Sequence, residues 1–88
     1  MIKVDSINKD SFKVTVNQDS TTEHDVLLTD NFHQIITNGK IDKVKLITKS
    51  FEFLLKRESN QSILKQFKLE VIQHYFPEYT DEMKKSIL

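Results

Sequence analysis

The chain has 88 residues, and its thirteen basic side chains balance thirteen acidic ones, so the formal net charge is zero. This length fits a single domain over residues 1–88, and six Phe, two Tyr and abundant aliphatic residues can supply its core. The absence of cysteine excludes disulfides and thiolate zinc sites and is typical of a reducing compartment. No stretch approaches the roughly 18 apolar residues of a membrane span, so we expect a cytoplasmic protein without membrane contact.

Alternating apolar and polar residues predict strands in the first third of the chain. Residues 12–16 read Phe-Lys-Val-Thr-Val, which is the period of a strand with one face in the core. Shorter alternating runs at residues 2–4 and 24–28 flank it, each separated from it by turn-prone polar residues. Strands joined by short turns usually pair, so the sequence predicts a three-stranded antiparallel sheet.

Helical periods replace the alternation after Thr29, which can cap a short helix that ends at Asn38-Gly39. Asp42 can cap a long helix over residues 43–58. This helix is apolar on two sides, with Val44, Ile47, Phe51, Leu54 and Leu55 on one face and Leu46 and Phe53 nearly opposite. We therefore expect it at the centre of the fold, between the sheet and the C-terminal helices.

The last third of the chain predicts three more short helices. Two apolar clusters indicate helices over residues 62–67 and 70–76, and Pro77 ends the second of them. Thr80 can cap a final helix, with acidic residues in its first turn and lysines farther along. Because strands precede helices, the order predicts an α+β fold with about four helices packed on one face of the sheet.

Charge is not uniform along the chain. Residues 1–39 carry three basic and six acidic side chains, whereas residues 40–58 carry six basic and three acidic ones. Such polarity favours self-association or a charged partner. The strong basic excess that is typical of nucleic-acid binding proteins is missing.

Three polar residues of the long helix stand out as a candidate interaction site or structural clamp: Ser50, Arg57 and Glu58. Ser50 is small enough to permit close packing between layers. Glu58 opposes the helix dipole, so a compensating contact is expected. Arg57 lies on the second apolar face, where its guanidinium can reach carbonyls or a carboxylate near Ser59-Asn60. A structural clamp is the main interpretation, and a ligand or partner contact is the alternative.

No catalytic, cofactor or metal site is predicted. His24, His33 and His74 come from different elements without metal-ligand spacing. Ser50 lies within a helix and not on a nucleophile elbow, and a single glycine cannot form a phosphate-binding loop. We therefore expect that the protein is not an enzyme.

Residues 62–67 and 70–76 have the outline of a helix-turn-helix, which makes nucleic-acid binding the alternative function. The second helix carries no basic residues for phosphate contacts, so Lys43, Lys45, Lys49 and Lys56 would have to supply them. Plain helix packing explains the same pattern, and nucleic acid is an unlikely partner on this basis.

The segment Ser-Phe-Glu-Phe-Leu-Leu-Lys-Arg-Glu at residues 50–58, followed by Tyr-Phe-Pro-Glu-Tyr at residues 75–79, resembles a family of small uncharacterised prokaryotic proteins of about this length. The resemblance covers most of the chain. It implies an α+β domain and carries no established activity, cofactor or functional residue. The function expected from the sequence is that of a small non-enzymatic module for protein interaction or regulation, with an unknown protein or a second copy as the partner.

Overall fold

Three strands at the start of the chain form an antiparallel meander in the computed structural model, which describes residues 1–88. They are β1 (Ile2–Ser6), β2 (Ser11–Asn17) and β3 (Thr21–Leu27). Val4 lies opposite Val14, and Val14 lies opposite His24, so one face of the meander is apolar. The prediction of three N-terminal strands in antiparallel order is confirmed.

A fourth strand makes the sheet mixed, which corrects the prediction of a purely antiparallel, three-stranded sheet. β4 (Gln66–Lys68) pairs in parallel with β3, and the strand order is β1-β2-β3-β4. The helix predicted over residues 62–67 does not form. Its backbone follows the edge of β3 instead, where the N–H of Asp25 donates to the carbonyl of Lys65 at 2.7 Å. The α+β class holds.

The first two helices follow the expected capping residues. In α1 (Asp30–Thr37), the side chain of Thr29 accepts from the N–H of Phe32, and the chain leaves through Asn38 at a positive φ of 52°. In α2 (Lys43–Leu55), Asp42 caps the N–H of Lys45. The predicted end at residue 58 was too late, because two N–H groups, those of residues 57 and 58, converge on the carbonyl of Leu54 and close the last turn.

The C-terminal part consists of short elements. A 3₁₀ turn η1 (Asn60–Ser62) precedes β4, and a second one, η2 (Leu69–Val71), leads into α3 (Ile72–Tyr75), which ends before Pro77. The last helix is α4 (Tyr79–Ile87), which begins without a side-chain cap, so Thr80 does not have the expected role. Because residues 62–67 are not helical, no helix-turn-helix forms.

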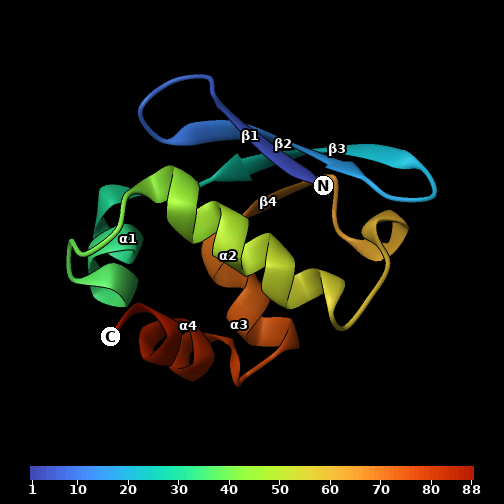
Figure 1. The fold of residues 1–88 in the computed structure, drawn as a ribbon. Helices are drawn as coiled ribbons and strands as arrows, with labels where there is room; N and C mark the ends of the chain where they lie inside the picture. Colours follow the sequence, from blue (N-terminus) through green and yellow to red (C-terminus); the bar gives the residue numbers. More distant parts are fainter.

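All the helices lie on the same side of the sheet (Figure 1). The long helix α2 runs between the sheet and the C-terminal α3 and α4, as expected (Figure 1). Its two apolar faces are filled: Ile47 and Phe51 on one and Leu46 and Phe53 on the other are buried. Val44 departs from the prediction, because 40% of it stays exposed. None of these helices has the length and apolar character that crossing a bilayer requires.

Candidate functional site

Ser50 lies in the core, where it joins α2 to the beginning of α4. Its Oγ donates to the carbonyl of Leu46 at 2.8 Å and lies 2.7 Å from the hydroxyl of Tyr79, and both Ser50 and Tyr79 are fully buried. Burial raises the pKa of the Tyr79 phenol well above its usual range, so this hydroxyl stays protonated. Ser50 is therefore a packing and hydrogen-bonding residue, inaccessible to a ligand.

Arg57 joins the end of α2 to α4 by a different set of contacts. Its guanidinium donates to the carbonyl of Phe53 at 3.0 Å and to the carboxylates of Glu78 at 3.2 Å and Glu82 at 2.6 Å. The guanidinium carbon also lies 3.6 Å from the centre of the Phe53 ring, a close cation–π contact. We call these four residues the arginine clamp: Phe53, Arg57, Glu78 and Glu82.

The clamp has the composition that the sequence suggested, a carbonyl and carboxylates around a guanidinium. Its carboxylates come from the start of α4, however, and not from the region of Ser59-Asn60. A hydrogen bond from its own backbone N–H, and then Arg57, lower the pKa of Glu78, so it is ionised at neutral pH. The guanidinium bonds to one carbonyl and two carboxylates, which makes the clamp a tie between two helices.

Glu58 is not part of this clamp, although it follows Arg57 directly. It lines an apolar groove between the end of α2, the segment around η1 and β4, and α3. The groove has a volume of about 150 Å³, and eight of its ten lining residues are hydrophobic: Leu54, Ile63, Leu64, Phe67, Val71, Ile72, Tyr75 and Phe76. Leu64 and Tyr75 are 46% and 65% exposed. We call this the Glu58 groove.

The carboxylate of Glu58 has no hydrogen-bond or ion-pair partner within the protein, in contrast to the neighbouring guanidinium. The only other polar residue of the groove is Ser62. Burial against the apolar wall raises the pKa of the Glu58 carboxyl. A positively charged group seated in the groove could pair with this partly buried carboxylate.

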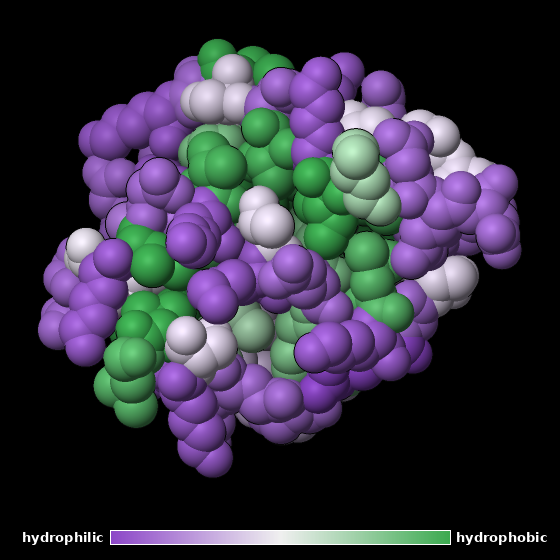
Figure 2. All heavy atoms as spheres, in the orientation of Figure 1, coloured by the Kyte–Doolittle hydropathy of each residue, from purple (hydrophilic) through white to green (hydrophobic).

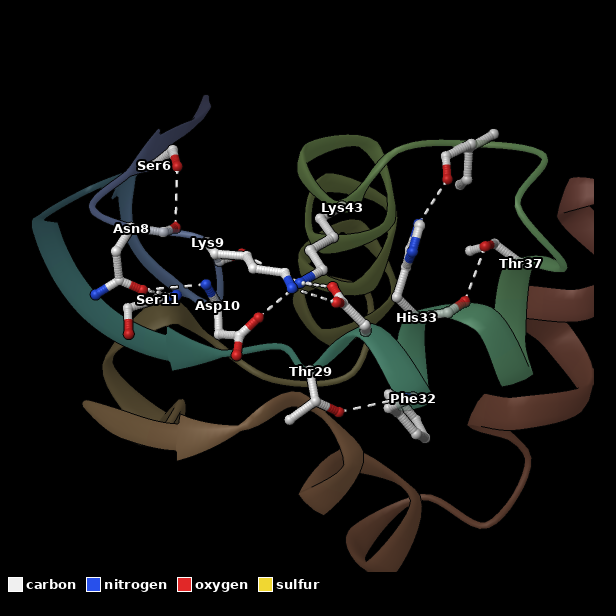
Figure 3. Close-up of polar contacts among 12 residues, drawn as sticks. Ser6, Asn8, Lys9, Asp10, Ser11, Thr29, Phe32, His33, Thr37 and Lys43 are labelled. Carbon is white, nitrogen blue, oxygen red and sulfur yellow. Dashed lines mark hydrogen bonds and ion pairs between the residues drawn. The ribbon is translucent and has the colours of Figure 1, made fainter.

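A second polar cluster, which was not predicted from the sequence, lies at the junction of the sheet and α2 (Figure 3). Nζ of Lys43 lies 2.7 Å from Asp30 and 2.9 Å from Asp10, and Lys9 lies 2.8 Å from Asp30. Hydrogen bonds from Lys43 first, and then from Lys9, lower the pKa of Asp30 to about 2. Each charge has an opposite partner, so this cluster ties α1, α2 and the first hairpin together.

Two of the three histidines, His24 and His33, take structural positions. His24 is buried on β3, with its Nδ1 2.8 Å from the carbonyl of Leu64 and its Nε2 2.9 Å from Oγ1 of Thr22. His33 contacts the carbonyl of Ile41 through Nε2 at 2.7 Å (Figure 3). His74 is exposed. No group of three or more His, Cys, Asp or Glu side chains is arranged to hold a metal ion.

The three residues singled out in the sequence thus lie in three different environments: the core for Ser50, the arginine clamp for Arg57 and the groove for Glu58. The groove itself was missed, because it depends on β4 and on the turn before it. The apolar residues that line it were instead assigned to a helix and to the core. The only sequence signal for this groove was the position of Glu58 at the end of a helix, where a negative charge is unfavourable.

Comparison of the chain with protein-family models, with curated proteins and with solved structures finds no match. The resemblance to a family of small prokaryotic proteins therefore stays a prediction.

Proposed function

We propose that this protein is a small non-enzymatic module of the cytoplasm, which binds a partner protein in the Glu58 groove. The observation that carries the proposal is the unpaired Glu58 carboxylate on the wall of an otherwise apolar groove. Binding sites are commonly apolar concavities with a few polar groups that orient the ligand. The groove has this composition, and its exposed rim residues, Leu64 and Tyr75, are of the kind that interfaces cover.

The size of the groove suggests what enters it. A cavity of about 150 Å³ with an aliphatic and aromatic lining can hold one benzene-sized group. A partner would therefore insert a single large apolar side chain. The carboxylate at its wall favours a neighbouring lysine or arginine, because a cation there can form a charge-assisted hydrogen bond with it.

Two small probes of similar size and opposite charge test this preference. Phenethylamine and phenylacetate share a phenyl ring, but the first carries an ammonium group and the second a carboxylate. In NMR titrations we expect phenethylamine to shift the amide signals of Ile63, Leu64 and Tyr75, and phenylacetate to shift them far less. In Glu58→Gln the two probes should become equivalent. Equal binding of both probes to the wild-type protein would contradict the proposed role of the carboxylate.

Affinity capture tests the function with protein partners. Wild-type protein is compared with Leu64→Glu, which changes the groove rim, and with Ile7→Glu, which changes an exposed apolar residue in the first turn of the sheet. We expect a partner that is retained by wild type and Ile7→Glu and lost with Leu64→Glu. A partner retained equally by all three would place the interaction elsewhere.

A further inference from the structure

We propose that β1 is the contact strand of a symmetric homodimer, in which the β1 strands of two copies pair antiparallel about a two-fold axis at Val4. This surface goes beyond the proposed function, because it lies at the β1 edge of the sheet, whereas the Glu58 groove adjoins β4 at the opposite edge. β1 forms one edge of the sheet and pairs only with β2. Its five residues are half-buried or exposed, so the protein itself does not seal this edge.

The backbone of β1 determines which residues can pair with a second copy. The N–H of Asn17 donates to the carbonyl of Met1, and the N–H of Ile7 donates to the carbonyl of Ser11. Because hydrogen-bonded and non-hydrogen-bonded pairs alternate in an antiparallel ladder, the odd-numbered residues of β1 bond to β2. The N–H and C=O groups of Ile2, Val4 and Ser6 therefore point to the open edge.

Charge then selects one register among the possible ones. When Val4 lies opposite Val4 of the second copy, Ile2 faces Ser6, and Lys3 of each copy faces Asp5 of the other. A shift that centres the pair on Lys3 sets two lysines opposite one another, and a shift that centres it on Asp5 sets two aspartates opposite one another. Opposite charges across strands stabilise a pair and like charges destabilise it, so the Val4 register is the favourable one of these three.

The ladder geometry is compatible with this register. With Val4 opposite Val4, the residues whose backbone groups point to the open edge become the hydrogen-bonded pairs. Lys3 and Asp5 then occupy non-hydrogen-bonded positions, where side chains of opposite strands approach most closely. The same two charges that face solvent in one copy would thus form two reciprocal ion pairs, as a two-fold interface requires.

The surface beside β1 is also suited to burial. Ile2 and Val4 stay half-buried on the face that α2 covers, and Val44 of α2 is 40% exposed. Figure 2 shows apolar side chains gathered between the sheet and α2 on this side of the molecule. A second copy paired along β1 would cover this seam and remove the open edge, which is otherwise a site of uncontrolled strand pairing.

Charge exchange between copies is the decisive experiment. Wild-type protein should be a dimer in sedimentation-equilibrium experiments over a concentration series from micromolar to millimolar. In a homodimer of Lys3→Asp, two aspartates would face one another at positions 3 and 5, and in a homodimer of Asp5→Lys two lysines would do so. Each variant alone should therefore dimerise at least about tenfold more weakly than wild type. An equimolar mixture of the two variants should recover dimers, because Asp at position 3 then faces Lys at position 5.

Lys68→Asp is the matched control, since it makes the same charge change on the opposite edge strand β4, and it should leave dimerisation unchanged. Hydrogen exchange adds a readout that does not depend on variants: the amides of Ile2, Val4 and Ser6 should exchange more slowly as wild-type concentration rises. A wild-type protein that is monomeric throughout would overturn the proposal. The proposal would also be overturned if both single variants dimerised as strongly as wild type, or if their equimolar mixture recovered no dimer. None of these results depends on the Glu58 groove.

Discussion

The hydroxyl of Tyr79 lies 2.7 Å from Oγ of Ser50, and this contact joins the start of α4 to the middle of α2 inside the core. The two groups are not equally dependent on each other. Ser50 also bonds to the carbonyl of Leu46, whereas the phenol of Tyr79 has no other partner. Since a buried polar group without a partner costs more than a lost hydrogen bond, the two residues should respond differently to mutation.

We expect Ser50→Ala to lower the free energy of unfolding by about 1 to 3 kcal/mol, because it leaves the buried phenol of Tyr79 without a hydrogen-bond partner. Tyr79→Phe should cost only about 0.5 to 1.5 kcal/mol, since Ser50 keeps its bond to Leu46. The double variant should resemble Tyr79→Phe alone. Urea denaturation of the four proteins measures these differences, and a larger loss in Tyr79→Phe than in Ser50→Ala would contradict the assignment.

The arginine clamp should contribute to stability through its fork of donors. Arg57→Met keeps most of the apolar stem and removes the bonds to Phe53, Glu78 and Glu82, so we expect a loss of about 1 to 2 kcal/mol. Arg57→Lys should not retain the full stability of wild type, because an ammonium group cannot reach two carboxylates and a carbonyl in the same geometry. Thermal denaturation provides the measurement.

Lys56→Met is the control for the clamp. It removes a neighbouring exposed cation that makes no ion pair, and its stability should stay within about 0.5 kcal/mol of wild type. If Arg57→Met and Lys56→Met were equally stable, the clamp would not be a significant tie between α2 and α4.

Glu58 should reduce stability at neutral pH. Its folded-state pKa is raised by burial, so the folded protein binds a proton more tightly than the unfolded chain, and this group's contribution becomes less unfavourable as the pH falls through the folded pKa. Its negative charge also follows the C-terminus of α2, where the helix dipole opposes it. We therefore expect Glu58→Gln to be more stable than wild type at pH 7 and to lose this advantage in acid.

Urea denaturation at several pH values tests the cost of Glu58, with Glu52→Gln in α2 as an exposed control. A gain in stability from Glu58→Gln, together with loss of the preference for phenethylamine, is the result expected of a binding residue. A variant less stable than wild type at pH 7 would show that the carboxylate supports the fold.

Asp30 should have the opposite pH dependence. Its pKa falls from an ordinary value of 3.8 to about 2, so its stabilising effect is fully present above the ordinary value and is lost as pH falls through the folded one. We expect wild type to lose more stability than Asp30→Asn across this acid interval. If the two proteins lost the same amount of stability as the pH falls, the assigned pairing of Asp30 with Lys43 and Lys9 would be ruled out.

His24 should hold the segment before β4 against β3. His24→Phe keeps a ring near Phe51, whose centre lies 5.4 Å away, but removes the bond to the carbonyl of Leu64. We expect a loss of about 1 to 3 kcal/mol and faster hydrogen exchange of the Asp25 amide, which bonds to Lys65. His74→Phe, at an exposed site, is the control, and unchanged exchange of the Asp25 amide in His24→Phe would contradict this role.

Elements with local signals could be predicted from the sequence. Alternation over residues 12–16 identified β2, and capping by Thr29 and Asp42 placed the starts of α1 and α2, because both signals depend on neighbours within one or two turns of the chain. The two apolar faces of α2 likewise placed this helix between layers. The acidic side chain of Glu58 at a helix C-terminus is also a local signal, since the helix dipole makes that position unfavourable for a negative charge.

Features that depend on distant partners required the tertiary contacts. β4 has only three residues and a period that a helix also fits, and it becomes a strand because β3 and His24 offer hydrogen bonds. Arg57 finds its carboxylates 21 and 25 residues away, a pairing that no local pattern encodes. The Glu58 groove needs β4 and α3 in place before its wall exists. Local propensity specifies a segment, whereas a binding surface arises from contacts between segments, and those are settled only when the whole chain packs.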